Sequence, residues 1–225
     1  MMNFRIFLVA LLLCGSLSAQ TTYTKSALEA GGGVHGTSSP FTPGYFQEDF
    51  NLPQVFVGGR YMLNENVGLR ATLGFLSMSE AEESQSFNSS YFRTSLEAML
   101  DLNRLLEIWN PDSRLTIFLH AGGGYSHVNY GDLDSGEDPG ITNTDRADNL
   151  GHFTGGFMPQ YRLNERFSLF ADFSFFGHVA QSYTWDGHRY LEEVPGGDGR
   201  IWNASVGIVY NLKTARSRWN CKPVF

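Results

Sequence analysis

Residues Tyr61–Phe75 read YMLNENVGLRATLGF, and residues Tyr161–Phe175 read YRLNERFSLFADFSF. The two stretches lie 100 positions apart and share Tyr, Leu, Asn, Glu, Leu, Ala and Phe at matched places. In each, an alternating segment enters a Leu-Asn-Glu turn and leaves as another alternating segment. Alternation with a period of two is typical of a β-strand with one apolar face. The sequence therefore predicts the same β-hairpin twice.

Eight alternating segments can be marked along the chain, separated by stretches rich in Gly, Pro and Asp. They cover residues 26–37, 53–62, 67–78, 90–101, 115–129, 150–162, 167–181 and 200–212. The connections at 63–66 and 163–166 are tight, and the one at 102–114 is moderate. The connections at 38–52, 79–89, 130–149 and 182–199 are long and polar. Short turns at one end and long loops at the other are typical of an outer membrane barrel, although a soluble barrel can also have unequal loops.

Charged residues occur in mid-strand, opposite continuous apolar faces. The polar faces also carry Gly and Ser, as a narrow lumen requires if charges pair inside it, and buried charges are tolerated when they are paired and hydrogen-bonded. The alternative is the solvated outer face of a soluble sheet. We expect a lumen charge network made of Arg60, Arg70, Arg93, Glu97, Asp101 and Asp172.

Aromatic residues are banded along the apolar faces. Tyr61, Tyr161 and Tyr210 fall at the short-turn end, and Phe92, Phe175 and Trp202 fall near the long-loop end. Two aromatic bands flanking aliphatic residues are favoured at the two boundaries of a membrane. We therefore expect these six residues to be membrane-interface aromatics.

Three further residues bear on the interior of the barrel. Phe170 and Phe176 lie on the polar face of their strand, where they would fill an interior that eight strands leave just wide enough for side chains. That filling argues against an open pore. Pro159 lies inside a predicted strand and lacks a ladder donor, so we expect a bulge or an irregular strand end there.

The first 19 residues are predicted to be a secretory signal peptide, with a basic start, the apolar stretch IFLVALLLC and small residues before Gln20. Lipidation at Cys14 is an alternative, although Leu13 stands where lipoprotein signals have a small residue. We expect a barrel domain over residues 20–212 and a short periplasmic tail over 213–225. After cleavage only Cys221 remains, so no disulfide framework is expected.

Charge and motifs argue against several classes of function. The net charge of −7 offers no basic patch for nucleic acid. The six histidines lack metal-ligand spacing, and the acidic loop 132–140 lacks the EF-hand pattern, so neither a metal nor another cofactor is expected. The glycines after His120 resemble an oxyanion loop, but no G-x-S-x-G elbow accompanies them, so we interpret them as strand glycines. Ser126 would need His152 or His178 as its base, because adjacent His127 points to the opposite face.

Between the fourth and fifth segments, the apolar residues of LNRLLEIW have helical spacing. Leu102, Leu105, Leu106 and Trp109 would share one face of a short helix. We interpret it as a helical turn that caps the end of the sheet, with a partner-docking helix as the alternative.

The Leu-Asn-Glu turns, the signal ending in Ser-Ala-Gln, the stretch MLDLNRLLEIWNPDSRLTIFLHAGGGYSH (99–127) and the second hairpin together resemble the outer membrane protein A-type barrel family. The resemblance implies an all-β fold, an eight-stranded antiparallel up-and-down transmembrane β-barrel in the Gram-negative outer membrane. It implies periplasmic N- and C-termini and contact with outer-membrane lipid and lipopolysaccharide. Many family members continue into a peptidoglycan-binding domain; this sequence ends soon after its last predicted strand, so that role is not expected.

The leading interpretation is a non-enzymatic barrel with a structural or interaction role, acting alone or as an accessory subunit of a larger outer-membrane complex. The alternatives are a narrow passive channel and a lipid-modifying outer-membrane enzyme. The sequence names no ligand and no partner.

Overall fold

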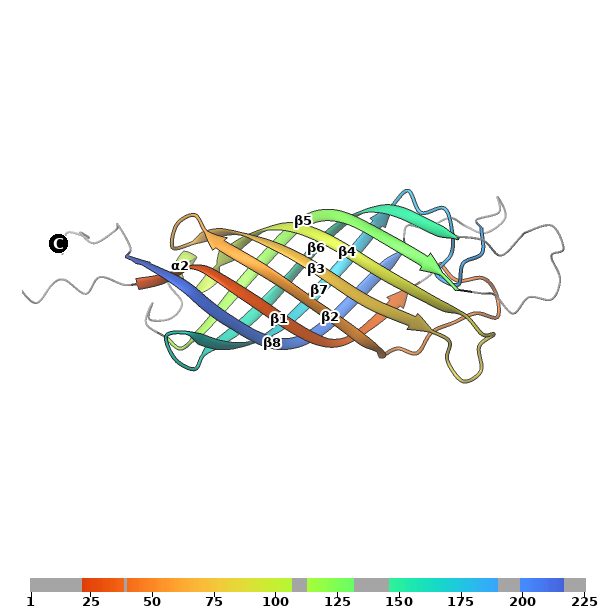
Figure 1. Cartoon of the computed structure of the whole chain (residues 1–225), viewed down its shortest axis with the longest axis horizontal. Helices are drawn as coiled ribbons and strands as arrows, with labels where there is room; N and C mark the ends of the chain where they lie inside the picture. Colours follow the sequence, from red (N-terminus) through yellow and green to blue (C-terminus); the bar gives the residue numbers. More distant parts are fainter. Residues whose placement is uncertain (1–21, 39, 107–112, 132–145, 190–198, 217–225) are drawn as a thin grey trace, which may run out of the picture.

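Each alternating segment forms a strand, and each strand pairs with its neighbours in sequence order. The computed structural model describes residues 22–38, 40–106, 113–131, 146–189 and 199–216. The strands are β1 (Thr22–Ser38), β2 (Asn51–Met62), β3 (Val67–Ser79), β4 (Asn88–Asp101), β5 (Leu115–Tyr130), β6 (Ala147–Arg162), β7 (Phe167–Val179) and β8 (Arg200–Arg216). All pairs are antiparallel, and β8 returns to β1, so the sheet is a closed barrel (Figure 1). The predicted all-β, eight-stranded fold is confirmed.

The two tight turns have the same hydrogen bonds. In each, the Asn side-chain oxygen accepts from the backbone N–H groups two and three residues later, at 2.8 Å from Asn64 and at 2.9 Å from Asn164. In each, the leucine before the Asn donates its N–H to the first residue of the next strand, at 2.9 Å and 3.0 Å. An Asn side chain that bonds to the backbone ahead of it is a common way to hold a tight turn. This requirement explains why the two hairpins share their Leu-Asn-Glu sequence.

The two faces of the wall differ in chemistry along every strand. In β3, Arg70 and Thr72 are buried inside the barrel, whereas Leu69 and Leu73 are 42% and 49% exposed on the outer surface. The same outward position in the other strands holds Val, Leu, Ile and Phe. A continuous apolar belt of this kind is unfavourable in water and favourable against lipid.

The glycines after His120 allow β5 to pack closely against β4 in the barrel wall. A side chain on Gly122 would overlap the carbonyl oxygen of Leu96, and one on Gly124 would overlap the carbonyl oxygen of Thr94, both on the neighbouring β4. Glycine is required at such close approaches of two backbones. The structural interpretation of these glycines therefore agrees with their positions.

The prediction at Pro159 is correct in part. Pairing between β6 and β7 is interrupted at Met158 and Pro159, yet it resumes at Gln160 in the same register. Proline removes one donor from the ladder, but no extra residue is inserted, so the expected bulge is absent. On its other side, Pro159 remains paired with Ile117 of β5.

The last strand is longer than predicted. β8 continues past Leu212 to Arg216, because β1 already begins at Thr22 and offers it a partner there. Residues 213–216 therefore belong to the wall rather than to a tail.

The helical turn between β4 and β5 is α2 (Leu102–Leu105), capped by the Asp101 side chain. Its leucines do not form the buried face that their spacing predicted, since Leu105 is 49% exposed. Asn103 is the buried residue instead, and it bonds to Leu115 O at 2.7 Å and Ile117 N at 3.2 Å. Among the described residues, no helix is long and apolar enough to cross a membrane.

Candidate functional site in the barrel lumen

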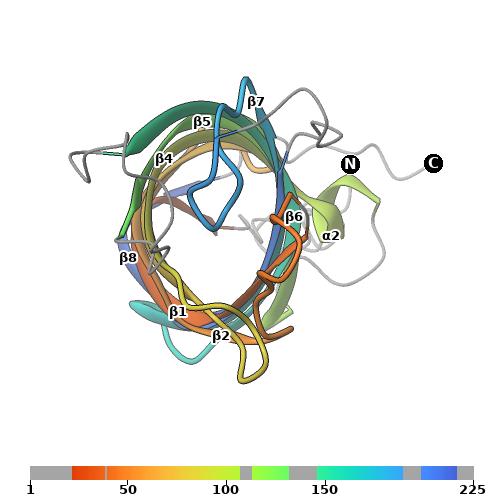
Figure 2. The ribbon, with the colours of Figure 1, turned by 90° about the vertical axis from the view of Figure 1, so that its right-hand side faces the viewer.

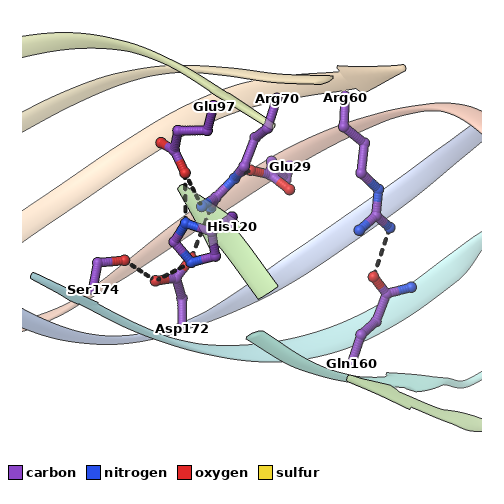
Figure 3. Close-up of polar contacts among 8 residues, drawn as sticks. All are labelled: Glu29, Arg60, Arg70, Glu97, His120, Gln160, Asp172 and Ser174. Atoms are coloured by element: carbon purple, nitrogen blue, oxygen red, sulfur yellow. Dashed lines mark hydrogen bonds and ion pairs between the residues drawn. The ribbon is translucent and has the colours of Figure 1, made fainter. Parts of the chain in front are cut away.

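An ion cluster centred on Arg70 occupies the middle of the lumen (Figure 3). Arg70 Nη2 lies 2.8 Å from Asp172 Oδ2, and Nη1 lies 3.4 Å from Glu97 Oε2. Its Nε donates to Glu29. The four residues come from β3, β7, β4 and β1, and each is at most 3% exposed. One guanidinium therefore joins four strands, through charge-assisted hydrogen bonds to Glu29 and Glu97 and through an ion pair with Asp172.

His120 of β5 lies between two carboxylates of this cluster. Its Nδ1 is 2.6 Å from Glu97 Oε2, and its Nε2 is 3.7 Å from Asp172 Oδ1 (Figure 3). The His120 ring therefore lies between the carboxylates of β4 and β7.

The other two lumen arginines are held differently. Arg60 Nη2 donates to Gln160 Oε1 at 2.6 Å, and its guanidinium lies 5.0 Å from the ring centroid of Phe118. Arg93 lies 4.1 Å from the ring centroid of Phe176. Cation–π contacts of this length stabilise a cation that has lost its water. We expected both arginines to pair with carboxylates, but the ion pairs found among the described residues include neither.

Asp101 does not join the lumen cluster. Its Oδ1 accepts from Arg104 N at 3.2 Å, and its Oδ2 lies 3.6 Å from Arg104 Nε. Asp101 lies outside the Arg70 cluster because it ends β4 and caps α2, but it is buried and lines the cavity at the turn end together with Arg60.

Little space remains around the cluster. The cavity bordered by Arg70, Arg93, Glu97 and Asp172 measures about 10 Å³. A cavity needs about 10–15 Å³ to hold one water molecule. Phe170 and Phe176, which we expected to fill the interior, are 4% and 3% exposed there. The middle of the barrel is therefore filled by side chains.

An aromatic plug closes the loop end of the barrel. Residues 180–189 of the connection between β7 and β8 fold across the mouth (Figure 2), and Trp185 is fully buried among inward residues such as Tyr91 and Leu150. Trp185 Nε1 donates to Ser38 O, and its backbone N–H donates to Pro40 O, both at 3.0 Å. The loop is thus fixed to the end of β1, the strand beside β8.

Contacts of the Asp186 carboxylate hold the same loop in place beyond the ends of the strands. Asp186 Oδ1 accepts from Thr42 N at 2.9 Å, and Oδ2 contacts His188 Nδ1. Burial alone would raise the pKa of Asp186, but the hydrogen bonds from His188 and Thr42 hold this pKa below its ordinary value. Asp186 therefore stabilises the loop as a carboxylate.

A chain of hydrogen bonds connects the plug to the lumen, and its direction can be assigned. His178 Nδ1 lies 2.9 Å from Gly199 O, which can only accept, so Nδ1 donates, and in a neutral imidazole the other nitrogen is then an acceptor. His178 Nε2 then accepts from Tyr91 OH at 2.7 Å. Because the Tyr91 hydroxyl donates its hydrogen to the bond with His178, its oxygen accepts a hydrogen bond from Ser126 Oγ at 2.6 Å.

That direction decides the role of Ser126. Because Ser126 donates to Tyr91, its oxygen accepts from His152 Nδ1 at 2.7 Å, and His152 Nε2 accepts from Ser95 at 2.9 Å. A serine nucleophile requires the reverse, with the histidine accepting its proton. The Ser–His contact that catalysis would require therefore exists between Ser126 and His152. However, His152 donates to Ser126 in this hydrogen bond, whereas a general base would accept the proton of the serine.

The turn end of the barrel is open. A cavity of about 570 Å³ is lined by lumen residues such as Arg60 and Phe118, by α2 and by the β6–β7 turn. The barrel is thus filled in the middle, closed at the loop end and hollow at the turn end.

The predicted interface aromatics all lie on the outer wall, where Tyr61, Tyr161, Tyr210, Phe92 and Phe175 are 37–68% exposed and Trp202 is half-buried. Trp202 packs against Phe50, with ring centroids 5.3 Å apart. Lys25 Nζ lies 5.5 Å from the Tyr61 ring. Their position at membrane boundaries stays a prediction.

Sequence reasoning missed Glu29, His120 and Trp185. Glu29 alternates with Ala27 and a run of glycines on β1, and this pattern marks it as an inward carboxylate. Trp185 carries a weaker signal, as a large apolar residue within a polar loop. Several expectations fall outside the described residues: the signal peptide (1–19), the acidic loop (132–140), Trp109 and the tail from residue 217, including Cys221.

Among the described residues, no group of three or more His, Cys, Asp or Glu side chains is arranged to hold a metal ion. The family model of the outer membrane protein beta-barrel domain matches residues 7–138, which is more than half of the chain. No curated protein matches the sequence.

Two solved structures are similar over nearly their whole lengths. Neisserial surface protein A, from Neisseria, has a TM-score of 0.53 and 10% identity, covering 85% of this chain and 99% of that one. A major outer membrane protein from Thermus thermophilus has a TM-score of 0.52 and 15% identity, covering 83% and 98%. At such identities the likeness shows the fold alone.

Proposed function

Because the chain belongs to the outer membrane protein beta-barrel domain family, and is thus an outer membrane β-barrel protein, we propose that it is a sealed, non-enzymatic barrel with a structural or interaction role. The observation that carries the proposal is the filled lumen. The Arg70 cluster joins four strands across the interior, and the cavity beside it is about 10 Å³. Above it, Trp185 blocks the loop end. A passive channel requires a continuous aqueous path, which these side chains interrupt.

The proposed orientation places the tight turns and both termini in the periplasm and the long loops outside the cell. β1 begins and β8 ends at the same end as the tight turns (Figure 1). Outer membrane barrels have short periplasmic turns and longer extracellular loops. In this orientation Tyr61, Tyr161 and Tyr210 contact the inner boundary of the membrane, and Phe92, Phe175 and Trp202 contact the lipopolysaccharide side.

The interaction role rests on apolar side chains at the loop end. Phe46 and Phe50, in the β1–β2 connection, are 42% and 70% exposed, and Leu52, at the start of β2, is 66% exposed. Exposed apolar side chains at the loop end suit contact with another membrane protein, so we propose that the barrel serves as an accessory subunit. Extraction in a mild detergent followed by mass spectrometry tests this role. A Phe50→Ser/Leu52→Ser variant should lose a stoichiometric partner that the wild type retains. Purification of the wild type without such a partner would contradict the accessory role.

Single-channel recording in planar bilayers tests the sealed lumen. We expect no steady conductance from the wild-type protein. A variant that combines Trp185→Ala with Arg70→Ala and Glu29→Ala should conduct, which shows that the assay detects an opened lumen. Steady conductance from the wild type would establish a channel instead.

A further inference from the structure

We propose that the hollow turn end of the barrel binds a small organic oxyanion, a carboxylate or phosphate that carries a neighbouring hydroxyl or amino group. Arg60 is the central cation of this site. The inference does not depend on the orientation of the barrel or on its being sealed, because it concerns only the cavity at the turn end.

The cavity has the size of a ligand pocket. Its volume of about 570 Å³ falls within the range of roughly 300–1,000 Å³ that is typical of small-molecule sites. The filled middle of the lumen forms its floor, where Phe118 and Met62 supply apolar contacts. A ligand that enters from the turn end therefore reaches a closed base instead of passing through.

The lining of the cavity is positive, although the chain as a whole has a net charge of −7. Four arginines line it, against two carboxylates: Arg60, Arg104, Arg114 and Arg162 face Asp101 and Glu165. Arg104 is already paired, with Glu65 at 3.1 Å and with Asp101 at 3.6 Å. A concave surface that gathers one sign of charge raises the local concentration of the opposite ion.

Arg60 is the best placed of these cations. Its side chain is 5% exposed, and Nη2 is occupied by Gln160 Oε1 at 2.6 Å, whereas Nη1 has no hydrogen-bond partner among the described residues. Of the nearby carboxylate of Glu29, Oε1 is bound to Arg70, and Oε2 makes no hydrogen bond to Arg60 or to any other described residue. The guanidinium fork matches an oxyanion of planar or tetrahedral shape. An arriving oxyanion would satisfy a buried charged donor.

Two neutral side chains in the same cavity restrict the class of ligand that would fit. Ser168 Oγ is fully buried without a hydrogen-bond partner in the described part of the chain, and it can donate to the oxyanion. Asn211 Oδ1 is equally unpartnered within the described residues, while its Nδ2 is bound to Glu165 O at 3.1 Å. Asn211 Oδ1 can only accept. It therefore selects a ligand with a hydroxyl or amino group close to its charge, as in a glycerol phosphate or a hydroxy acid.

The test measures binding of glycerol phosphate to the purified barrel in neutral detergent at low salt, by calorimetry and by shifts of the Ser168 and Asn211 amide resonances. We expect Arg60→Met to weaken binding at least tenfold and Ser168→Ala to weaken it several-fold. Arg200→Gln, at the exposed loop end of β8, is the matched control and should bind as the wild type does. Inorganic sulfate should bind more weakly than glycerol phosphate, because at physiological pH it carries no hydroxyl that could donate to Asn211.

Each variant is first checked for folding by the shift in gel mobility on heating. If Arg60→Met does not fold, Arg60→Lys keeps the charge without the fork and should still lose affinity. Equal binding by wild type and the Arg60 variant, or resonance shifts confined to the loop end, would overturn the proposal. Competition by phosphatidylglycerol in nanodiscs identifies a lipid headgroup as the occupant, whereas undisturbed binding identifies a free solute.

Discussion

Arg70 Nη2 lies 2.8 Å from Asp172 Oδ2, and this ion pair joins the two matched hairpins at positions where their sequences differ. The second hairpin has Phe170 in place of Arg70, and the first has Thr72 in place of Asp172. The residues that the hairpins share form the turns and the outer wall. The residues that differ meet inside and provide the contacts that hold opposite walls together.

Arg70→Met should destabilise the barrel by about 3–5 kcal/mol, because it leaves three buried carboxylates without their cation. Methionine has a similar volume, so the loss reflects charge more than packing. Denaturant unfolding in detergent, followed by heat-modifiable gel mobility, measures the effect. Arg200→Met, on the exposed end of β8, is the control. Adding Asp172→Asn and Glu29→Gln to Arg70→Met should restore part of the stability; if it does not, the charge explanation is wrong.

Trp185→Ala should release the β7–β8 connection from the mouth of the barrel. The side chain is fully buried and anchors the loop to Ser38 O. We expect cleavage of the loop by added protease to become at least tenfold faster. No conductance should appear, since the Arg70 cluster lies deeper in the lumen. Phe50→Ala removes an exposed aromatic residue and should leave the protease rate unchanged. Protection equal to that of the wild type would contradict the anchoring role of Trp185.

Ser126→Ala should cost about 1–3 kcal/mol of stability, because it removes the hydrogen bond that Tyr91 OH accepts and leaves the buried His152 Nδ1 without its partner. The lipid A mass spectrum of cells that carry this variant should match that of wild-type cells. A change in lipid A that follows loss of the Ser126 hydroxyl would instead favour the lipid-modifying enzyme, and would reverse the polarity assigned to the hydrogen-bond chain.

The loop that carries Asp186 should loosen in acid. The pKa of Asp186 is lowered in the folded protein, so its stabilising contribution is full above the unfolded pKa of about 3.9 and is lost as the pH falls through the folded value. Hydrogen exchange at the Trp185 amide, compared at fixed intrinsic rate between pH 7 and pH 3, measures this loss. In Asp186→Asn the protection should be lower at pH 7 and lack the acid-dependent step. An unchanged step in that variant would assign the effect to another group.

The matched turns provide a paired experiment. Asn64→Ala and Asn164→Ala each remove two side-chain hydrogen bonds to the backbone. We expect each to destabilise the barrel by about 1–2 kcal/mol in the same unfolding assay, at about 1 kcal/mol or less for each exposed bond. Asn66→Ala is the control, since Asn66 uses its backbone carbonyl to bind Asp101 N. A large difference between the two variants would mean that the turns differ in role despite their geometry.

The strands and turns were predictable because alternation and turn chemistry are local. Each of the eight predicted segments overlaps one strand, and the same Asn bonds are made in both turns. The end of β8 was misplaced, since the length of a strand in a barrel depends on its partner, here β1 from Thr22. Where a strand ends thus depends on two segments that are distant in the sequence, so it cannot be predicted from either segment alone.

The residues of the lumen were predictable as inward-facing, but their partners were not. Arg60, Arg70 and Arg93 have the same chemistry in the sequence, yet only Arg70 lies within reach of three carboxylates among the described residues. The stagger of the strands around the barrel decides which side chains share a level. That stagger also brought in Glu29, and it placed Asp101 at the turn end.

The interruption at Met158 and Pro159 makes one place in the wall easier to open than its surroundings. β6 and β7 are unpaired at these two residues near the turn end, although the pairs on either side keep one register. Local opening needs less free energy than global unfolding. The backbone amides of β6 and β7 beside the interruption should therefore exchange with solvent sooner than those in the uninterrupted part of the same ladder.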